Sequence, residues 1–203
     1  MSHYFETPTD RSSRHLVHAR IWDRDYEFHS APGVFSAHQL DIGTRVLFRS
    51  ATPPDDGATR LLDLGCGFGP IAIALASECE NAQVDAVDVN DLALQLTTEN
   101  ARALGVDDRV RARRPDELLS EEPRYDEIWS NPPIRIGKQA LHQLLLTWLP
   151  RLSPGGSAFL VVGKNLGADS LQVWLATQGW NAERIASAKG FRVFRVQRIS
   201  HGG

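Results

Sequence analysis

A glycine-rich segment, Asp63-Leu64-Gly65-Cys66-Gly67-Phe68-Gly69-Pro70, lies between a predicted strand and a predicted helix. Glycine lets the backbone turn sharply and lets a ligand come close, because it has no Cβ atom. An open α/β sheet binds ligands at this position, beyond the carboxyl ends of its strands. Asp88 ends the next predicted strand, nineteen residues after Gly69. A carboxylate there can hold both hydroxyl groups of an adenosine ribose, so the segment predicts a cofactor that contains a nucleoside.

The glycine spacing distinguishes between two such cofactors. A dinucleotide fingerprint reads G-x-G-x-x-G, whereas here the third glycine comes one residue early and Pro70 takes the required position. Asp63 is poorly suited to a pyrophosphate and well suited to the ammonium group of a methionine moiety. Pro70 fits the first position of a helix, since its φ is preset and it has no N–H to leave unpaired. These features favour S-adenosylmethionine over NAD.

A second motif, Asn131-Pro132-Pro133-Ile134, follows a predicted strand at the same edge of the sheet. Consecutive prolines impose a rigid, extended backbone. The Asn131 side-chain oxygen and the Pro132 carbonyl can each accept one hydrogen from a planar amino group, which is a weak nucleophile because its lone pair is delocalised. Holding that amine against a sulfonium methyl group would help mainly by positioning, with modest electrostatic help. The motif predicts N-methylation without a strong base, with Asn131, Pro132 and Pro133 as the catalytic residues.

The bulk composition is ordinary for a globular protein of one domain, with 203 residues, 42% of them hydrophobic and 23% charged. The longest apolar stretches are far shorter than the roughly 18–20 residues of a membrane helix, and the first residues lack the layout of a secretory signal. Cys66 and Cys79 make a poor disulfide framework, and no Cys/His pair has zinc-site spacing. We therefore expect a reduced, cytoplasmic, monomeric protein without a bound metal.

The net charge of −3 neither supports nor excludes a nucleic-acid partner, although proteins that bind nucleic acid are usually basic. Arginines do cluster in two stretches, 109–114 and 192–198. At either stretch a solvated strand edge is the commoner explanation of such a run.

The order of predicted elements indicates the fold class. A small hairpin at 19–28 and a helix at 40–48 precede a polar, proline-containing loop at 50–56. After that loop, strands and helices alternate. Strands are predicted at 60–64, 83–89, 109–113, 127–130 and 158–162, with helices at 70–79, from the cap Asp91 to Gly105, and at 139–149. We expect residues 1–50 to form an N-terminal extension packed on a cofactor-binding domain at 51–203.

The C-terminal part differs from the rest. Predicted strands at 182–187 and 191–197 are joined only by Ala188-Lys189-Gly190, a link too short for anything but an antiparallel hairpin. Alternating strands and helices predict a parallel sheet covered on both faces. The sequence therefore predicts an α/β, Rossmann-like class I methyltransferase fold, with a seven-stranded, mostly parallel sheet and an antiparallel C-terminal hairpin strand.

With both motifs in hand, the sequence resembles the small-domain ribosomal RNA guanine methyltransferases, which are Rossmann-like and methylate the exocyclic amine of a guanine in small-subunit RNA. The resemblance covers nearly the whole chain, and its most particular stretch runs from Asn131 to Lys138. It also includes His3-Tyr4-Phe5, Gly33-Val34-Phe35-Ser36, Leu40-Asp41-Ile42-Gly43, Gly69-Pro70-Ile71, Val87-Asp88-Val89-Asn90, Lys164, Gly167-Ala168 and Lys189-Gly190-Phe191.

The resemblance implies roles for individual residues. Those around the cofactor would be Asp63, Gly65, Cys66, Gly67, Gly69, Asp88, Val89, Asp116 and Asn131. Within this set, Asp88 would bind the ribose, Asp116 would lie near the adenine amine, and Asn131 would hold the target amine. The partner would be small-subunit (16S) ribosomal RNA or the small ribosomal subunit.

One departure concerns the substrate base. Many amine methyltransferases place an aromatic residue after Asn-Pro-Pro to stack on a flipped base, whereas this chain has Ile134. Stacking could come instead from Phe35 or from the Tyr4-Phe5 pair, or the base could pack on an aliphatic surface. Arg135 and Lys138 are candidate phosphate contacts, with a solvated helix start as the other explanation.

Four other functions are considered from the sequence. The same amine chemistry would serve a protein methyltransferase acting on a glutamine amide, or an enzyme for another RNA amine. A module that binds the cofactor or RNA without turnover is disfavoured by the intact Asn131 and Asp88. An oxidoreductase is disfavoured by Pro70.

Overall fold

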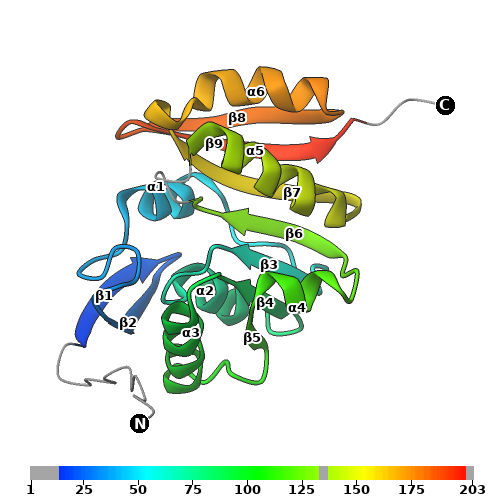
Figure 1. Cartoon of the computed structure of the whole chain (residues 1–203). Coiled ribbons are helices and arrows are strands. Elements are labelled where there is room, and N and C mark those ends of the chain that lie inside the picture. Colours follow the sequence, from blue (N-terminus) through cyan, green and yellow to red (C-terminus); the bar gives the residue numbers. More distant parts are fainter. Residues whose placement is uncertain (1–13, 133–136, 200–203) are drawn as a thin grey trace, which may run out of the picture.

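The computed structural model describes residues 14–132 and 137–199, which form a central sheet with helices around it (Figure 1). The sheet has seven strands in the order β5-β4-β3-β6-β7-β9-β8. In chain order they are β3 (Arg60–Leu64), β4 (Gln83–Val87), β5 (Val110–Arg113), β6 (Tyr125–Ser130), β7 (Leu152–Gly163), β8 (Trp180–Ala188) and β9 (Phe191–Arg198). A separate two-stranded sheet consists of β1 (His15–Ile21) and β2 (Arg24–Ser30).

The strand directions confirm the predicted fold. The pairs from β5 through β7 are all parallel. Strand β9 is antiparallel to both of its neighbours, β7 and β8. The link between β8 and β9, which is only Lys189-Gly190 because Ala188 belongs to β8, therefore closes the predicted antiparallel hairpin.

Helices cover both faces of this sheet. They are α1 (Ile42–Ser50), α2 (Pro70–Glu78), α3 (Asp91–Ala103), α4 (Pro115–Leu119), α5 (Gly137–Trp148) and α6 (Ala168–Thr177), with two short 3₁₀ segments, η3 (Leu149–Arg151) and η4 (Lys164–Leu166). Successive strand residues point to opposite faces, so Leu61 joins the core under α1, α2 and α3, and Leu62 joins the core under α4, α5 and α6. Burial of β3 on both faces explains why neighbouring residues such as Leu61 and Leu62 are both apolar.

Several element boundaries differ from the predictions. Asn90, not Asp91, caps α3, since the Asn90 side chain accepts from the Leu92 N–H and Asp91 is already helical. Strand β7 begins at Leu152, before the predicted start at residue 158, and so contains Pro154-Gly155-Gly156. There the register with β6 shifts, from Tyr125 opposite Leu152 to Glu127 opposite Ser157, so the segment is an irregularity within the strand.

The hairpin of β1 and β2 is confirmed, and it is attached to the rest of the fold. Val17 and Phe28 belong to the same apolar core as α1 and α2. The extension and the sheet thus share a core, while the division of the chain at residue 50 stays a prediction. In the described ranges, no helix has the length and apolarity that crossing a membrane requires.

Candidate active site

The carboxyl edge of the central strands brings the two predicted motifs together. The Gly65 and Cys66 N–H groups donate to the Val87 carbonyl at 2.8 and 3.0 Å, which fixes the glycine turn to the end of β4. One Asp88 oxygen accepts from the Gly67 N–H at 3.0 Å. On the other side, the Ser130 hydroxyl donates to the Leu64 carbonyl at 2.6 Å and so fixes the end of β6 beside β3.

The glycine turn requires glycine most strictly at its last position. Gly69 has a φ of +91° and caps α2, and Pro70 is the first residue of that helix, as predicted. A Cβ atom at Gly69 would lie 2.9 Å from the side chain of Thr97 in α3. At Gly67, by contrast, a Cβ would meet no described atom within 4 Å, so the space in front of the turn is open to a ligand.

The larger of two adjoining cavities lies in front of this turn and has a volume of about 410 Å³. This is within the range of roughly 300–1,000 Å³ for small-molecule sites. Gly65, Gly67, Asp88 and Val89 line it from the strand ends, as predicted for cofactor residues, and Asn131 borders it. The opposite wall is mostly apolar and comes from α4 and α5, including Pro115, Leu119, Leu144, Thr147 and Trp148. This wall was not predicted from the sequence, because nothing in an amphipathic helix shows which of its apolar residues face a ligand.

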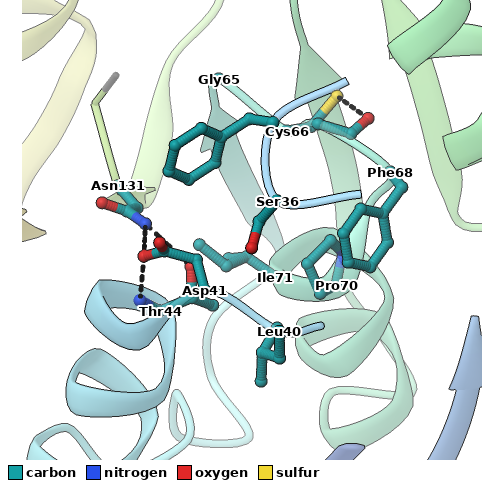
Figure 2. Close-up of a pocket in the computed structure, with 12 residues that line it drawn as sticks. Ser36, Leu40, Asp41, Thr44, Gly65, Cys66, Phe68, Pro70, Ile71 and Asn131 are labelled. Carbon is teal, nitrogen blue, oxygen red and sulfur yellow. Dashed lines mark hydrogen bonds between the residues drawn. The ribbon is translucent and has the colours of Figure 1, made fainter. Parts of the chain in front are cut away.

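A smaller cavity of about 30 Å³ adjoins the first between the glycine turn and the N-terminal segment (Figure 2). Phe35, Gly65, Gly67 and Asn131 line both cavities. Cys66 lines the smaller one, and burial raises the pKa of its thiol well above the ordinary value, so this sulfur is no candidate nucleophile. Phe35, 47% exposed, lies where it would cover a bound cofactor, and its proposed stacking on a base stays a prediction.

Asp63 lies fully buried below the glycine turn. Its Oδ2 accepts from the Ala72 N–H at 2.9 Å, and its Oδ1 has no hydrogen-bond partner in the described part of the chain. Burial, with a smaller contribution from the charge of Asp88, raises the pKa of Asp63 to about 8. A cationic group nearby would stabilise the ionised carboxylate, so the environment suits the ammonium of a methionine moiety. Asp63 itself lines neither cavity, and its role stays a prediction.

Asn131 is 8% exposed and its carboxamide is held on one side (Figure 2). Its Nδ2 donates to Asp41 Oδ2 at 2.7 Å and to Thr44 Oγ1 at 2.9 Å. Both partners lie at the start of α1, where Asp41 is the N-cap. Asp41 is part of the resemblance, but neither it nor Thr44 was predicted to belong to the site. A strong N-cap residue is visible in a sequence, but its second partner, 90 positions away, is not.

The remaining residues predicted to bind cofactor or substrate do not line the two cavities or lie outside the described residues. Asp116 is exposed and ion-paired with Arg114 at 3.7 Å, while its neighbours Pro115 and Leu119 line the cavity. Its assignment to the adenine amine stays a prediction. Lys138 is exposed in the first turn of α5. Pro133, Ile134 and Arg135 lie outside the described residues.

Several arginines of the two stretches are paired with acids. Arg113 contacts Glu121 at 2.5 Å, Arg114 contacts Asp91 at 2.5 Å, and Arg192 contacts Asp169 at 3.2 Å. These pairs agree with the solvated strand edges that such runs usually represent. Within residues 14–132 and 137–199, no cluster of three or more His, Cys, Asp or Glu side chains has the geometry to hold a metal ion.

The site therefore offers apolar walls that suit a planar base and, at the rim, the acid Asp88, which suits ribose hydroxyls. Together these features fit S-adenosylmethionine. A dinucleotide would also need donors for its pyrophosphate, whereas Asp88 places a carboxylate beside the glycine turn, where it accepts from the Gly67 N–H.

Comparison with known proteins agrees with a site for S-adenosylmethionine, because the proteins that match include methyltransferases. Residues 25–195 match the family described as "Methyltransferase small domain". The uncharacterized protein YbxB of Bacillus subtilis is 30% identical over 200 residues, which are 97% of this chain and 98% of that protein. Ribosomal RNA large subunit methyltransferase G of Pseudomonas syringae is 33% identical over 202 residues, 96% of this chain and 53% of that protein.

A solved structure shares the fold over almost the whole chain. The T. thermophilus 16S rRNA guanine-N2 methyltransferase, in complex with AdoMet and guanosine, superposes with a TM-score of 0.79 at 28% identity, covering 95% of this chain and 53% of that one. The chain thus spans about half the length of the ribosomal RNA methyltransferases that it matches here. It belongs to the methyltransferase small-domain family, and its cofactor is S-adenosylmethionine.

Proposed function

We propose that the protein methylates the exocyclic amine of a guanine in ribosomal RNA, with small-subunit RNA as the preferred substrate. The observation that carries this proposal is the position of Asn131, which borders both cavities in front of the glycine turn. The T. thermophilus relative, whose name gives a 16S guanine N2 target, supports the guanine amine. The Pseudomonas syringae relative, which is named for the large subunit, makes large-subunit RNA the competing substrate.

The cofactor supplies a methyl group bound to a positively charged sulfur. In the proposed reaction the amine nitrogen forms the new N–C bond as the S–C bond breaks, and the proton that the amine loses passes to water. The contribution of the chain is to hold the amine, because Asn131 Oδ1 and the Pro132 carbonyl can each accept one of its hydrogens. Positioning of this kind lowers barriers without any strong base.

Three lysines supply a rim that RNA phosphates could contact. They are all the lysines of the chain, Lys138, Lys164 and Lys189, and all three are exposed. The Lys164 N–H donates to the Gly190 carbonyl, next to Lys189, at 2.9 Å. The Lys138 Cδ lies 3.8 Å from the position of a Cβ on Gly167, three residues after Lys164. Lysines gathered on one rim, in a chain of net charge −3, suit phosphate contacts that position an RNA.

The proposal is tested by incubating the protein with labelled S-adenosylmethionine and four acceptors: small subunits, naked 16S RNA, large-subunit RNA and a release-factor protein. Label in 16S RNA, recovered as N2-methylguanosine after digestion, is the expected result. Label only in large-subunit RNA would correct the target, and label only in protein would overturn the RNA proposal in favour of glutamine methylation. Asn131→Ala should remove transfer while cofactor binding persists.

A further inference from the structure

We propose that Asp41 and Thr44 are positioning residues that orient the carboxamide of Asn131, so that its Oδ1 faces the reacting amine. The inference rests on the proposed amine chemistry and adds two residues that support Asn131. Asp41 and Thr44 would act only through Asn131, to which both are hydrogen-bonded at 2.7 and 2.9 Å.

The chemistry of the groups fixes which way the amide points. An ionised carboxylate can only accept hydrogen bonds, whereas an amide has a donating NH₂ end and an accepting oxygen end. Only the NH₂ end of Asn131 can therefore face Asp41. A rotation of the amide by 180° would turn Oδ1 toward the carboxylate, lose the hydrogen bond to Asp41 and place two acceptors together, even though the Thr44 hydroxyl could then donate to Oδ1. The pairing consequently leaves Oδ1 as the end that is free to accept from a substrate.

Asp41 is itself held in place. Its Oδ2, the atom that receives the Asn131 NH₂, also accepts from the Gly43 N–H at 2.6 Å and the Thr44 N–H at 3.2 Å. The residue is the N-cap of α1, with φ −56° and ψ 146°. One carboxylate oxygen thus ends a helix and orients the amide, so the first turn of α1 sets the direction of Asn131.

Gly43 keeps the surroundings of Oδ1 open. A Cβ atom on Gly43 would lie 3.1 Å from Asn131 Oδ1 and 2.9 Å from Phe191 Cε1. Any side chain at this position would crowd the oxygen that we assign to the amine. Glycine at the first turn of α1 therefore permits α1, Asn131 and Phe191 to meet without filling the space that the substrate needs.

The charge of Asp41 adds a second effect. As the amine nitrogen forms its fourth bond it becomes positive, and its remaining N–H bonds become stronger donors. Hydrogen bonds to an ionised group are stronger than neutral ones, and hydrogen bonds in a chain polarise one another. Donation from Nδ2 to the Asp41 carboxylate therefore makes Oδ1 a better acceptor as that positive charge develops.

The test uses four substitutions chosen to keep the helix cap or the side-chain shape. Serine and asparagine are both good N-caps, so Asp41→Ser removes the contact with Asn131 and Asp41→Asn keeps a similar shape without the charge. Thr44→Val removes the acceptor with little change in shape, and Thr44→Ser restores it. Asp55→Ser is the matched control, because Asp55 also accepts from the N–H two residues on, at 3.0 Å, but it lies in the loop before β3.

We expect Asp41→Ser to lower kcat roughly 10- to 100-fold, as misplacement of a positioning group does, while the Kd of S-adenosylmethionine changes less than about twofold. Asp41→Asn should fall between Asp41→Ser and the unaltered protein. Thr44→Val should lose a smaller part of kcat, and Thr44→Ser should regain most of it. Asp55→Ser should leave kcat unchanged. Equal kcat in Asp41→Ser and the unaltered protein would overturn the proposal, as would a loss of kcat that only follows a loss of cofactor binding.

A readout without any substrate separates this inference from the proposed function. The side-chain NH₂ resonances of Asn131, assigned by their disappearance in Asn131→Ala, report the hydrogen bonds directly. We expect Asp41→Ser and Thr44→Val to shift them and to speed their exchange with water, with no change in Asp55→Ser. Unchanged resonances in Asp41→Ser would refute the contact itself. Absence of methyl transfer from the unaltered protein to every RNA, with shifted resonances in these variants, would refute the RNA substrate alone.

Discussion

Asn100 in α3 joins the glycine turn to the N-terminal hairpin. Its Nδ2 donates to the Phe68 carbonyl and to the His29 carbonyl, both at 2.8 Å, and its Oδ1 accepts from the His29 N–H at 2.7 Å. The side chain is fully buried. One amide thus satisfies three backbone groups from two segments that are about 40 positions apart in the sequence, and it sets the distance between them.

The first prediction concerns this amide. Asn100→Asp retains the shape but replaces two donated hydrogen bonds by a carboxylate facing two carbonyl oxygens. Leaving buried polar groups without their hydrogen-bond partners lowers the free energy of unfolding by roughly 1–3 kcal/mol or more. We expect a clear fall in Tm in differential scanning calorimetry, together with a weaker Kd for S-adenosylmethionine. An unchanged Tm would mean that the hairpin and the turn hold their places without Asn100.

The second prediction separates a clash from backbone strain at glycine. Gly69 and Gly105 both have positive φ, +91° and +69°, but a Cβ meets Thr97 at 2.9 Å only at Gly69. Gly105→Ala should cost only about 1–2 kcal/mol from the left-handed backbone. Gly69→Ala should lower the free energy of unfolding further and weaken cofactor binding. Urea unfolding and isothermal titration of both variants provide the check, and equal losses would show that strain alone explains the glycine.

The third prediction follows from the pKa of Asp63, which burial raises to about 8. A group whose pKa is higher in the folded protein than in the unfolded chain binds more protons when folded, so its contribution to stability falls as the pH rises between the two values. Here that window runs from about 4 to about 8. The cofactor-free protein should lose stability across it, relative to Asp63→Asn, when the free energy of unfolding is measured at several pH values.

Cofactor binding supplies a further check on Asp63. If the ammonium of the methionine moiety lies near this carboxylate, binding favours the ionised form and releases a proton below pH 8. Calorimetry at pH 7 in buffers of different ionisation enthalpy should then detect a release approaching one proton, and the release should vanish in Asp63→Asn. Binding without proton release in the unaltered protein would place the ammonium elsewhere.

The fourth prediction concerns Asp88, whose oxygens accept from the Gly67 and Asn90 N–H groups at 3.0 and 2.9 Å and can still accept from ribose hydroxyls. Hydrogen bonds to a charged acceptor contribute about 1.5–3 kcal/mol. Asp88→Asn should therefore raise the Kd of S-adenosylmethionine roughly 10- to 100-fold. Asp91→Asn, at an exposed neighbouring acid paired with Arg114, is the control and should bind normally. Equal affinities of the two variants would contradict the ribose assignment.

The fifth prediction concerns the lysine rim. Replacing Lys138, Lys164 and Lys189 by alanine should raise the KM for RNA and make binding less sensitive to salt, because each phosphate contact releases counterions. The Kd of S-adenosylmethionine should not change. Arg113→Ala, which removes a single positive charge paired with Glu121, is the control. A triple variant with the salt dependence of the unaltered protein would place the RNA on another surface.

The fold could be predicted from the sequence because its signals are local. The glycine turn, Pro70 and the short link before Phe191 each restrict the backbone within a few residues, and all three appear where they were expected. Helices α4 and α6 were not predicted. Helix α4 has only five residues, too few to show a period, and nothing in the side chain of Gly167 marks it as the N-cap of α6.

The site could be predicted only as far as its motifs extend. Asp88 and Asn131 stand at strand ends, and parallel strands bring their carboxyl ends to one edge. The hydrogen bonds that Asp41 and Thr44 accept from Asn131 could not be predicted, since the packing of α1 against the sheet brings these residues together. The face of α5 that lines the cavity was hidden for a similar reason, because Leu144 reads like any other apolar helix residue.

Strand β9 follows β8 in the sequence but lies between β7 and β8 in the sheet. During synthesis, the edge of β7 beyond β6 therefore has no partner until residues 191–198 have left the ribosome. Unpaired strand edges of this kind are sites of aggregation. Phe191, which packs at Gly43 beside Asn131, arrives with the same strand. The nascent chain consequently passes through a stage in which β7 is exposed to misassembly, and the sheet edge that carries Asn131 receives Phe191 only when that stage ends.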